Sequence, residues 1–290
     1  MAVNRSHVLV TGASTGIGQA CAVRLDRLGY SVFAGVRKPE DGVRLQAAAS
    51  ARLVPVQLDV TKPLEIAAAA AQIALAVGPR GLAGLVNNAG VAGGGPIEFV
   101  PVDTVRQIFE VNVFGLLAVT QACLPMLRTA RGRVINIGSI AGKAVSPMVV
   151  PYGMSKHAVE ALTDGLRLEL GEAGIHASVI EPGAVKTPIW DKGVEALGDA
   201  ERTLPKVALE RYGAKLKVFG KVLAHLNDRG VPVELVADAV VDALEATTPK
   251  TRYLVGTDAK IRAFIARFLP NRLVDRLVLR AIQRMEDGLS

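Results

Sequence analysis

The sequence predicts an α/β protein with one doubly wound parallel sheet, and three observations lead to this fold class. Short apolar runs alternate with longer segments of helical periodicity through most of the 290 residues. The apolar runs are rich in β-branched residues and do not alternate with polar ones, which is typical of strands covered on both faces. No linker rich in Pro, Gly or Ser divides the chain. Right-handed crossovers then place helices on both sides of a single sheet.

Each apolar run is predicted to be a strand, and each periodic segment a helix. The predicted strands are residues 7–11, 31–35, 53–58, 82–87, 133–138, 177–181 and 252–255. The predicted helices are residues 16–29, 40–50, 63–77, 102–127, 152–173 and 232–247. Residues 187 to about 230 carry charged helical segments after the sixth strand and are predicted to form a lid over the ligand crevice. We therefore expect one domain over residues 1–256 and a helical extension over residues 257–290.

Composition limits the classes of function. Hydrophobic residues make up 50% of the chain and charged residues 21%, so there is ample material for a buried core. The net charge is +7, and seven Lys/Arg against four Asp/Glu from Asp258 onward supply +3 of it. Aromatic residues are only 4% and no dense basic run contains them. We therefore expect no nucleic-acid partner.

The two cysteines, Cys21 and Cys123, fall in apolar helical stretches without the close partners that a metal site needs. We expect buried thiols, no bound metal and a cytoplasmic location. No apolar run is expected to reach the length of a membrane span, because Asn112, Gly115 and Pro125 interrupt residues 111–127. Residues 1–6 contain no apolar signal core.

A glycine-rich turn follows the first predicted strand. Residues 11–18 read Thr-Gly-Ala-Ser-Thr-Gly-Ile-Gly, with glycines at 12, 16 and 18. Glycines allow a tight turn and close backbone approach, and a pyrophosphate binds well at the helix N-terminus that follows. The alternative is a turn with no ligand, but the position at the first β-α junction favours a dinucleotide.

The ends of the next strands carry further candidates for the dinucleotide. At the end of the second strand, Val36 is followed by Arg37 and Lys38. A carboxylate there would favour NAD, whereas two cations can pair with a 2′-phosphate, so NADP is favoured over NAD. The alternative is two ordinary surface charges.

The third and fourth strands end in Asp59-Val60 and in residues 87–90, Asn-Asn-Ala-Gly. Asp59 could accept a hydrogen bond from the adenine amino group, or it could cap the helix that follows. The small residues at 89 and 90 suit close approach of a cofactor, and the amides can bridge neighbouring strands.

A reactive set surrounds the fifth strand. Ser139 comes just after it, and Tyr152 and Lys156 open the following helix at i and i+4, on one helical face. A free tyrosine has a pKa near 10 and is a poor base at neutral pH. A nearby ammonium, together with an oxidised nicotinamide, is expected to lower that pKa. A Tyr-x-x-x-Lys pattern alone is common on exposed helices, but its placement after a fifth parallel strand is specific.

Together these motifs resemble the short-chain dehydrogenase/reductase family, in its compact single-domain branch with a Rossmann fold. The resemblance covers residues from about 7 to 190 in order and spacing. It is carried by residues 11–18 and 87–90 and by Asn112, Ser139, Tyr152, Lys156 and Pro182-Gly183.

The resemblance implies an oxidoreductase that transfers a hydride between NADP(H) and a carbonyl/alcohol pair. Tyr152 would be the general acid/base, and Ser139 would hydrogen-bond the substrate oxygen. Lys156 would hold the nicotinamide ribose and depress the tyrosine pKa, and Asn112 would hold a water in a proton relay. The implied cofactor-binding residues are Gly12, Ser14, Thr15, Gly16, Ile17, Gly18, Arg37, Lys38, Asp59, Val60, Asn88, Ala89, Gly90, Tyr152, Lys156, Pro182, Gly183, Val185 and Thr187. Many NADP-dependent members carry a basic residue where this chain has Thr15, which keeps NAD(H) open as the alternative.

Residues 32–39 and 152–160 further resemble members that act on retinoids and hydroxysteroids. Residues 144–151 form an apolar loop between Ser139 and Tyr152. Its Val145, Met148 and Val149, together with Trp190 of the lid, are predicted to line a lipophilic substrate pocket. The alternative for these four side chains is ordinary core packing.

The extension after residue 257 has helical periodicity in two segments separated by Pro270. Apolar residues share one face, with six arginines among or opposite them. Docking on the domain or on a sister subunit is the favoured interpretation, and peripheral contact with an anionic membrane is the alternative.

Two rival functions stay open. One is a 3-oxoacyl thioester reductase, which the apolar loop and long tail fit less well. The other is a non-catalytic NADP-binding redox sensor, which would not need Tyr152. By resemblance, helices 102–127 and 152–173 would form the interfaces of a homodimer or homotetramer.

Overall fold

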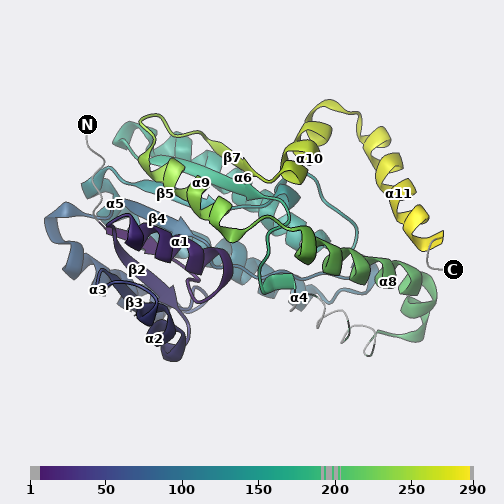
Figure 1. Cartoon of the computed structure of the whole chain (residues 1–290), viewed down its shortest axis with the longest axis horizontal. Helices are drawn as coiled ribbons and strands as arrows, with labels where there is room; N and C mark the ends of the chain where they lie inside the picture. The colour runs from purple at the N-terminus through teal and green to yellow at the C-terminus, as the bar shows by residue number, and fades with distance from the viewer. Residues whose placement is uncertain (1–6, 191–192, 194–197, 199–201, 203, 288–290) are drawn as a thin grey trace.

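The computed structural model describes residues 7–190, 193, 198, 202 and 204–287, and a seven-stranded parallel sheet runs through its centre (Figure 1). The strands lie in the order β3-β2-β1-β4-β5-β6-β7. Their bounds are β1 His7–Val10, β2 Ser31–Val36, β3 Leu53–Gln57, β4 Gly84–Asn87, β5 Arg133–Ile137, β6 His176–Pro182 and β7 Arg252–Val255. The order reverses between β1 and β4. At such a point, ligands of doubly wound sheets bind beyond the carboxyl ends of the strands.

Helices connect the strands and extend beyond the last one. They are α1 Gly16–Arg27, α2 Pro39–Ala47, α3 Pro63–Val77, α4 Val102–Phe109, α5 Leu116–Ala130, α6 Val150–Leu170, α8 Lys206–Arg229, α9 Val233–Glu245, α10 Thr257–Phe268 and α11 Asn271–Asp287. Short 3-10 turns lie at η1 Gly78–Arg80, η2 Ile97–Phe99, η4 Ile140–Gly142 and η5 Gly171–Ala173, and a π-helical segment, η3 Glu110–Gly115, joins α4 to α5.

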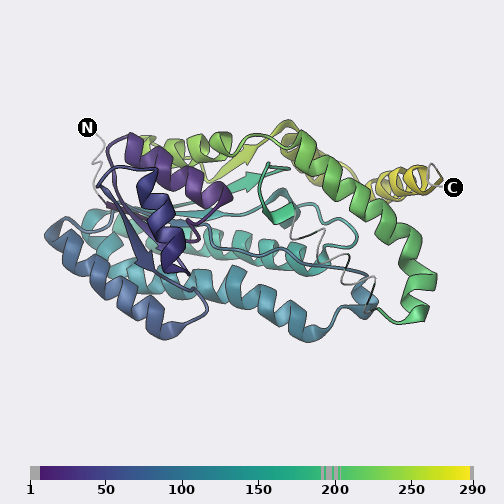
Figure 2. The same cartoon turned by 60° about the horizontal axis from the view of Figure 1, so that its bottom comes forward.

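The helices form one layer on each face of the sheet (Figure 2). On one face, α1 and α9 pack against the sheet through side chains such as Leu25 and Val240. On the other face, α3, α5 and α6 do so through Ile73, Leu127 and Leu166. Because both faces are buried, the strands contain the continuous apolar runs seen in the sequence.

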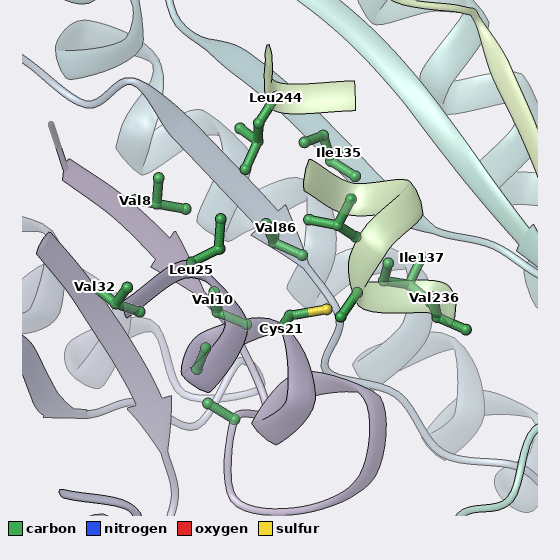
Figure 3. Close-up of a cluster of buried hydrophobic side chains, with 14 of the residues drawn as sticks. Val8, Val10, Cys21, Leu25, Val32, Val86, Ile135, Ile137, Val236 and Leu244 are labelled. Atoms are coloured by element: carbon green, nitrogen blue, oxygen red, sulfur yellow. The ribbon is translucent and has the colours of Figure 1, made fainter. Parts of the chain in front are cut away.

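Figure 3 shows the cluster on the α1/α9 face, which includes Val8, Leu25 and Leu244, and in which the sulfur of Cys21 points towards α9. A fully buried side chain of this size contributes about 1.5–3 kcal/mol to folding. Both cysteines are free and buried, as predicted, and burial raises the pKa of Cys21 and Cys123 to about 12. They are inert thiols of the core.

The predicted fold class is confirmed, and helix 63–77 and strand 252–255 have the predicted bounds. The predicted helix 102–127 differs: it continues to Ala130 and contains the π-helical segment η3. A π turn inserts one extra residue into an α-helix. Periodicity does not reveal it, because Asn112 in this segment bonds to the main chain of Val91, in the connection after β4.

The continuous helical segment Val102–Ala130 is long and apolar enough to span a membrane by length and composition, so the prediction that no run reaches this length was wrong. Its charged residues, Asp103, Arg106, Glu110 and Arg128, lie towards its two ends and leave residues 111–127 uncharged. The segment is 39% buried inside the protein and supplies Val119, Cys123 and Leu127 to the core beneath the sheet. These contacts make it a helix of the domain.

The predicted lid contains one long helix, α8. Residues 191–192, 194–197, 199–201 and 203 of the lid lie outside the described residues. Arg211 and Tyr212 on α8 both bond the carboxylate of Glu98, at 2.5 Å and 2.9 Å. The rings of Phe99 and Tyr212 are edge to face, with centroids 6.0 Å apart. The lid helix is therefore attached to the η2 turn, in the long connection after β4.

Candidate active site

The glycine-rich turn passes from β1 to α1 with no room for side chains. Gly12 and Gly16 have φ angles of 62° and 58°, in the left-handed region that favours glycine. A Cβ at Gly12 would lie 2.8 Å from the Cα of Ala89, and one at Gly18 would lie 2.2 Å from the carbonyl oxygen of Gly12. The glycines thus let the turn and the end of β4 approach closely.

Thr11 and Asn88 tie this turn to the end of β4. The Thr11 hydroxyl accepts hydrogen bonds from the main-chain N–H groups of Asn88 and Ala89, both at 3.0 Å. The Asn88 side-chain amide donates to the carbonyls of Thr11 and Gly12, both at 3.0 Å. Asn88 therefore shapes the turn with its amide. Sequence reasoning did not single out the hydroxyl of Thr11, although its place at the strand end could have shown it.

The N-terminus of α1 is suited to an anion. Its first residue follows Thr15, which is extended and makes no capping hydrogen bond with its side chain, and no acidic residue lies in the first turn. The first N–H groups of a helix lack partners within the helix and carry a partial positive charge. The close-packed glycines 12, 16 and 18, which we call the glycine cradle, lie beside it. This end therefore fits the pyrophosphate of a dinucleotide. Ser14 and Ile17 lie half-buried in the same turn.

Arg37 and Lys38 follow β2 and are both exposed. Asp59 follows β3, where its Oδ1 accepts from the N–H and hydroxyl of Thr61, at 2.9 Å and 2.7 Å. Burial alone would raise the pKa of Asp59, but the Thr61 hydrogen bonds and the charges of Arg37 and Lys62 bring it below its ordinary value. Asp59 therefore carries a negative charge close to Arg37.

The start of α3 corrects the alternative interpretation in which Asp59 caps this helix. Lys62, and not Asp59, is the N-cap of α3, and it makes no side-chain cap bond. Asp59 instead closes the short turn to Thr61. Val60 packs against the π-helical segment, because a Cβ at Gly115 would lie 2.7 Å from the Val60 carbonyl oxygen.

Asn112 is buried in the π-helical segment, and its side chain is fully engaged. Its Oδ1 accepts from the N–H of Val91 at 2.8 Å. Its Nδ2 donates to the carbonyl of Val91 at 2.9 Å and to the hydroxyl of Ser155 at 3.0 Å. A Cβ at Gly90 would lie 3.3 Å from Asn112 Oδ1 and 3.9 Å from Lys156 Nζ. The end of β4, the π segment and α6 therefore converge at this point.

Ser139, Tyr152 and Lys156 come together beside that point. The hydroxyl of Ser139 lies close enough to the Tyr152 phenol to favour the phenolate and lower its pKa, and Ser139 Oγ accepts from the N–H of Ala141 at 3.1 Å. The ammonium of Lys156 lies 5.6 Å from the centroid of the Tyr152 ring and donates to the carbonyl of Ile137 at 2.8 Å. These contacts bring the reactive set predicted from the sequence into one group.

Electrostatics at this group differ from the expectation. Burial raises the pKa of Tyr152, and the hydrogen bond with Ser139 only partly opposes it. Burial also lowers the pKa of Lys156 to about 8. The protein's own groups therefore keep Tyr152 protonated, because desolvation disfavours the charged forms of both residues. The predicted lowering of the tyrosine pKa included the positive charge of an oxidised nicotinamide.

The segment after β6 returns to the glycine-rich turn. Pro182 ends β6, and a Cβ on Gly16 would lie 3.4 Å from the Thr187 side chain. Asp258 at the start of α10 accepts from the N–H of Ala184 at 2.9 Å, and its carboxylate occupies the space where Gly183 would carry a Cβ. Sequence reasoning missed this role of Asp258, because nothing local links residue 258 to residue 183.

The predicted substrate residues lie in two places: Val145, Met148 and Val149 in the loop between η4 and α6, and Trp190 after β6. Val145 is 44% exposed and packs against Gly153, next to Tyr152. Met148 is only 7% exposed, with a left-handed φ of 68°, and its carbonyl accepts from the N–H of Gly95 at 2.7 Å. Val149 is half-buried. Trp190 donates its indole N–H to the carbonyl of Val185 at 2.6 Å. Val145 is thus placed beside the reactive group, whereas Met148 packs inside the protein.

Comparison with known proteins agrees with this arrangement. The sequence model of the short chain dehydrogenase family matches residues 6–197. Among characterised relatives, the NADPH-dependent 3-dehydrocapnine reductase of Ornithobacterium rhinotracheale is 36% identical over 96% of this chain and 98% of its own. Retinol dehydrogenase 5 of Mus musculus is 36% identical over 98% of this chain and 91% of its own. The 17-beta-hydroxysteroid dehydrogenase type 6 of Bos taurus is 36% identical over 94% and 88%.

Solved structures show the same fold. A short-chain dehydrogenase from Streptomyces avermitilis superposes with a TM-score of 0.75 at 28% identity, covering 98% of both chains. One from Burkholderia cenocepacia, solved in complex with NADP, superposes with a TM-score of 0.71 at 26% identity, covering 94% of this chain and 96% of its own. With its parallel sheet, glycine-rich turn and Ser-Tyr-Lys group, the chain belongs to the short chain dehydrogenase family of oxidoreductases, which act on alcohol and carbonyl groups.

Proposed function

We propose that this protein is an NADP(H)-dependent dehydrogenase/reductase of a lipophilic alcohol or ketone, with Tyr152 as its general acid and base. The observation that carries the proposal is the group of Ser139, Tyr152 and Lys156, in which the Ser139 hydroxyl adjoins the Tyr152 phenol and the Lys156 ammonium lies 5.6 Å from the centroid of the Tyr152 ring. It lies at the carboxyl ends of β4 and β5, next to the cradle that fits a dinucleotide.

Each side chain has a distinct part in the proposed chemistry. When bound, the nicotinamide supplies or accepts the hydride. Tyr152 gives its proton to the substrate oxygen during reduction and takes it back during oxidation. Ser139 Oγ holds the same oxygen through a hydrogen bond. Lys156 would bind the ribose hydroxyls of the nicotinamide half. Pro182, Gly183, Val185 and Thr187 would flank the nicotinamide.

Asn112 supports the group through its position. Its side chain is fully engaged with Val91 and Ser155. The water of a proton relay towards Lys156 would therefore be held by the main-chain carbonyl of Asn112. A π-helical turn leaves carbonyls without their usual α-helical partner, and such turns recur at functional sites.

The preference for NADP(H) is proposed to come from Arg37 and Lys38. Both are exposed at the end of β2, where a 2′-phosphate would sit, and no carboxylate occupies the strand end. A relative named as NADPH-dependent and a neighbour solved with NADP support this assignment. Replacing Arg37 by Ala should raise the KM for NADPH and leave the KM for NADH unchanged. Arg128→Ala, an exposed charge at the far end of α5, is the matched control. Equal effects on both cofactors would contradict the assignment.

The substrate is proposed to be bulky and apolar, such as a steroid or retinoid. Val145 is exposed beside Gly153 and Tyr152, and the relatives include a retinol dehydrogenase and a hydroxysteroid dehydrogenase. The test measures NADPH and NADH oxidation with steroid ketones, retinal, acetoacetyl thioesters and small aldehydes, with Tyr152→Phe as control. Turnover of small polar carbonyls alone would contradict the substrate class. Tight NADPH binding without turnover of any compound would favour the redox sensor.

The C-terminal extension is proposed to be docked. Arg262 on α10 donates to the carbonyl of Ala144 at 2.6 Å and to the hydroxyl of Ser146 at 3.1 Å, and α11 contacts α8. Phe264, Phe268 and Leu279 are about 60% exposed, and we propose that a sister subunit of a cytoplasmic homodimer or homotetramer covers them.

Truncation separates docking from membrane contact. A chain ending at Pro270 removes α11 and keeps α10, with its bonds to Ala144 and Ala184. If docking is right, full-length protein does not float with anionic liposomes, and the truncation changes the sedimentation behaviour. Flotation of the full-length protein that is lost on truncation would instead assign α11 to the membrane surface.

A further inference from the structure

Behind the reactive group, charged side chains from four elements meet inside the protein. Glu181 on β6 is fully buried, and Glu160 on α6 is 8% exposed. Lys143 follows the η4 turn, and Arg252 opens β7. None of these residues belongs to the proposed chemistry.

The two carboxylates share their cationic partners. Lys143 Nζ lies 3.2 Å from Glu160 Oε2 and 3.1 Å from Glu181 Oε1. Arg252 Nε lies 3.0 Å from Glu160 Oε2 and 3.6 Å from Glu181 Oε1. The other end of Arg252 binds Asp164 at 2.7 Å, and Asp164 also pairs with Arg167 at 3.1 Å. The two cations that reach the glutamates are therefore divided among three carboxylates.

Several oxygens of the pair lack hydrogen bonds. Among the described residues, Glu160 Oε1 and both carboxylate oxygens of Glu181 are buried and accept no hydrogen bond of good geometry from a neighbouring donor. Two ionised carboxylates in such a place would be costly. A hydrogen bond between the two carboxyl groups removes much of that cost. In agreement, burial and the adjacent Glu160 raise the pKa of Glu181 to about 7.

We propose that Glu160 and Glu181 share one proton at neutral pH and act as positioning residues for the reactive group. The inference rests on the proposed roles of Ser139, Tyr152 and Lys156. The pair touches neither substrate nor cofactor, and it acts through the three elements that it joins.

The joined elements are those that carry the site. Glu160 follows Lys156 by one turn of α6, and Glu181 directly precedes Pro182 at the end of β6. A Cβ at Gly142 would lie 2.9 Å from the Lys156 carbonyl oxygen and 3.2 Å from Glu160 Cγ, so the turn after Ser139 presses on the same part of α6. Loss of the shared proton adds a second negative charge and strengthens the pull on Lys143. The position of the Ser139 turn therefore responds to the charge of the pair.

The test uses Glu181→Gln and Glu160→Gln in the full-length protein, with Glu169→Gln, an exposed position on α6, as the matched control. Infrared difference spectra between about pH 6 and pH 8 report a carboxylic acid that loses its proton. The wild type and the control should show this band, and both pair variants should lack it. The same proteins are then assayed for the pH profile of kcat/KM. The near-neutral ionisation should disappear in Glu181→Gln, with kcat at the plateau unchanged.

Each outcome decides one statement. A wild type without a titrating carboxylic acid in this range overturns the shared proton, and this readout needs neither turnover nor a folded variant. A band that is present, with a near-neutral ionisation of kcat/KM that persists in Glu181→Gln, overturns the positioning role. If Glu181→Gln does not fold, Glu160→Gln decides in its place. A band that is present in a protein without turnover of any substrate refutes the proposed function and leaves the shared proton standing.

Discussion

Two neighbouring influences shift the pKa of Tyr152 in opposite directions, and each favours one direction of the reaction. Burial keeps the phenol protonated, which suits donation of a proton to a nascent alkoxide during reduction. The hydrogen bond with Ser139 acts in the opposite direction and favours the phenolate that oxidation needs. The same side chain thus has a built-in bias towards the acid form, which Ser139 moderates.

We expect Tyr152→Phe to lower kcat/KM by roughly 10²–10⁴, the usual contribution of general acid/base catalysis. The ring stays in place and only the proton is lost, so the Kd for NADPH, measured by fluorescence titration, should not change. A variant that retains most of its turnover would refute the assignment of Tyr152.

The pH profile tests the balance around Tyr152. Because its pKa lies above the ordinary value, alcohol oxidation should rise with pH through the alkaline range, while ketone reduction should stay level from above the near-neutral ionisation of the Glu160–Glu181 pair until the phenol ionises. Removing the stabilising hydrogen bond in Ser139→Ala should move the alkaline limb of the oxidation profile to higher pH. A shift to lower pH would contradict the described contact.

Close packing at Gly18 gives a prediction about the cradle. A Cβ there would lie 2.2 Å from the carbonyl oxygen of Gly12 and 2.3 Å from Asn88 Nδ2. We expect Gly18→Ala to destabilise the protein by about 1–3 kcal/mol in urea unfolding and to weaken NADPH binding strongly. Gly165→Ala, on α6 with nothing within 4 Å of its Cβ, is the control and should be neutral or stabilising. Equal stability and equal NADPH affinity of the two variants would contradict close packing at Gly18.

At the scale of elements, α10 links the end of the chain to the site. Asp258 accepts from the N–H of Ala184 and fills the space above Gly183, and Arg262 reaches the loop at Ala144. The segment that is proposed to flank the nicotinamide is therefore supported by a helix that begins after the last strand. The domain boundary predicted at residue 256 stays a prediction, but these contacts make α10 part of the machinery that shapes the site.

We expect Asp258→Ala to cost about 1.5–3 kcal/mol of unfolding free energy, because it removes a charged acceptor from a half-buried N–H. The freed segment should also raise the KM for NADPH more than it lowers kcat. Urea unfolding and steady-state kinetics measure the two effects. Lys260→Ala, exposed on the same helix, serves as control. A change in kcat alone would argue that Asp258 acts elsewhere.

At the scale of the whole molecule, the site lies at the carboxyl edge of the parallel sheet, and a buried cluster of charged side chains lies behind it. Glu181 has a pKa of about 7, against 4.5 for an ordinary glutamate. Between these values the folded state binds more protons than the unfolded state, so stability falls as pH rises. Below about pH 4.5 the effect vanishes, and above about pH 7 the full penalty is present.

Glu181→Gln should therefore gain stability relative to the wild type between pH 5 and pH 8, by about 2 kcal/mol once partial screening is allowed for. Urea unfolding at several pH values measures the difference. The matched variant Glu169→Gln should show no such trend. A constant difference between Glu181→Gln and the wild type across this range would contradict a raised pKa for Glu181.

The sequence by itself determined the order of strands and helices, the glycine-rich turn and the Ser-Tyr-Lys set. These are local patterns, in which period, turn chemistry and spacing along one helix are enough. It also determined the family, because these motifs occur in order over most of the chain. The substrate residues were less predictable, since Met148 packs inside the protein while Val145 is exposed beside the site.

Only the tertiary structure decided the contacts between distant parts of the chain. The π-helical segment at Asn112 depends on its bonds to Val91, and the support of Gly183 by Asp258 joins residues 75 positions apart. The pairing of Glu160 with Glu181 and the direction of the Tyr152 pKa follow from burial. Burial and long-range hydrogen bonds arise when elements pack, and a linear pattern does not record which elements become neighbours.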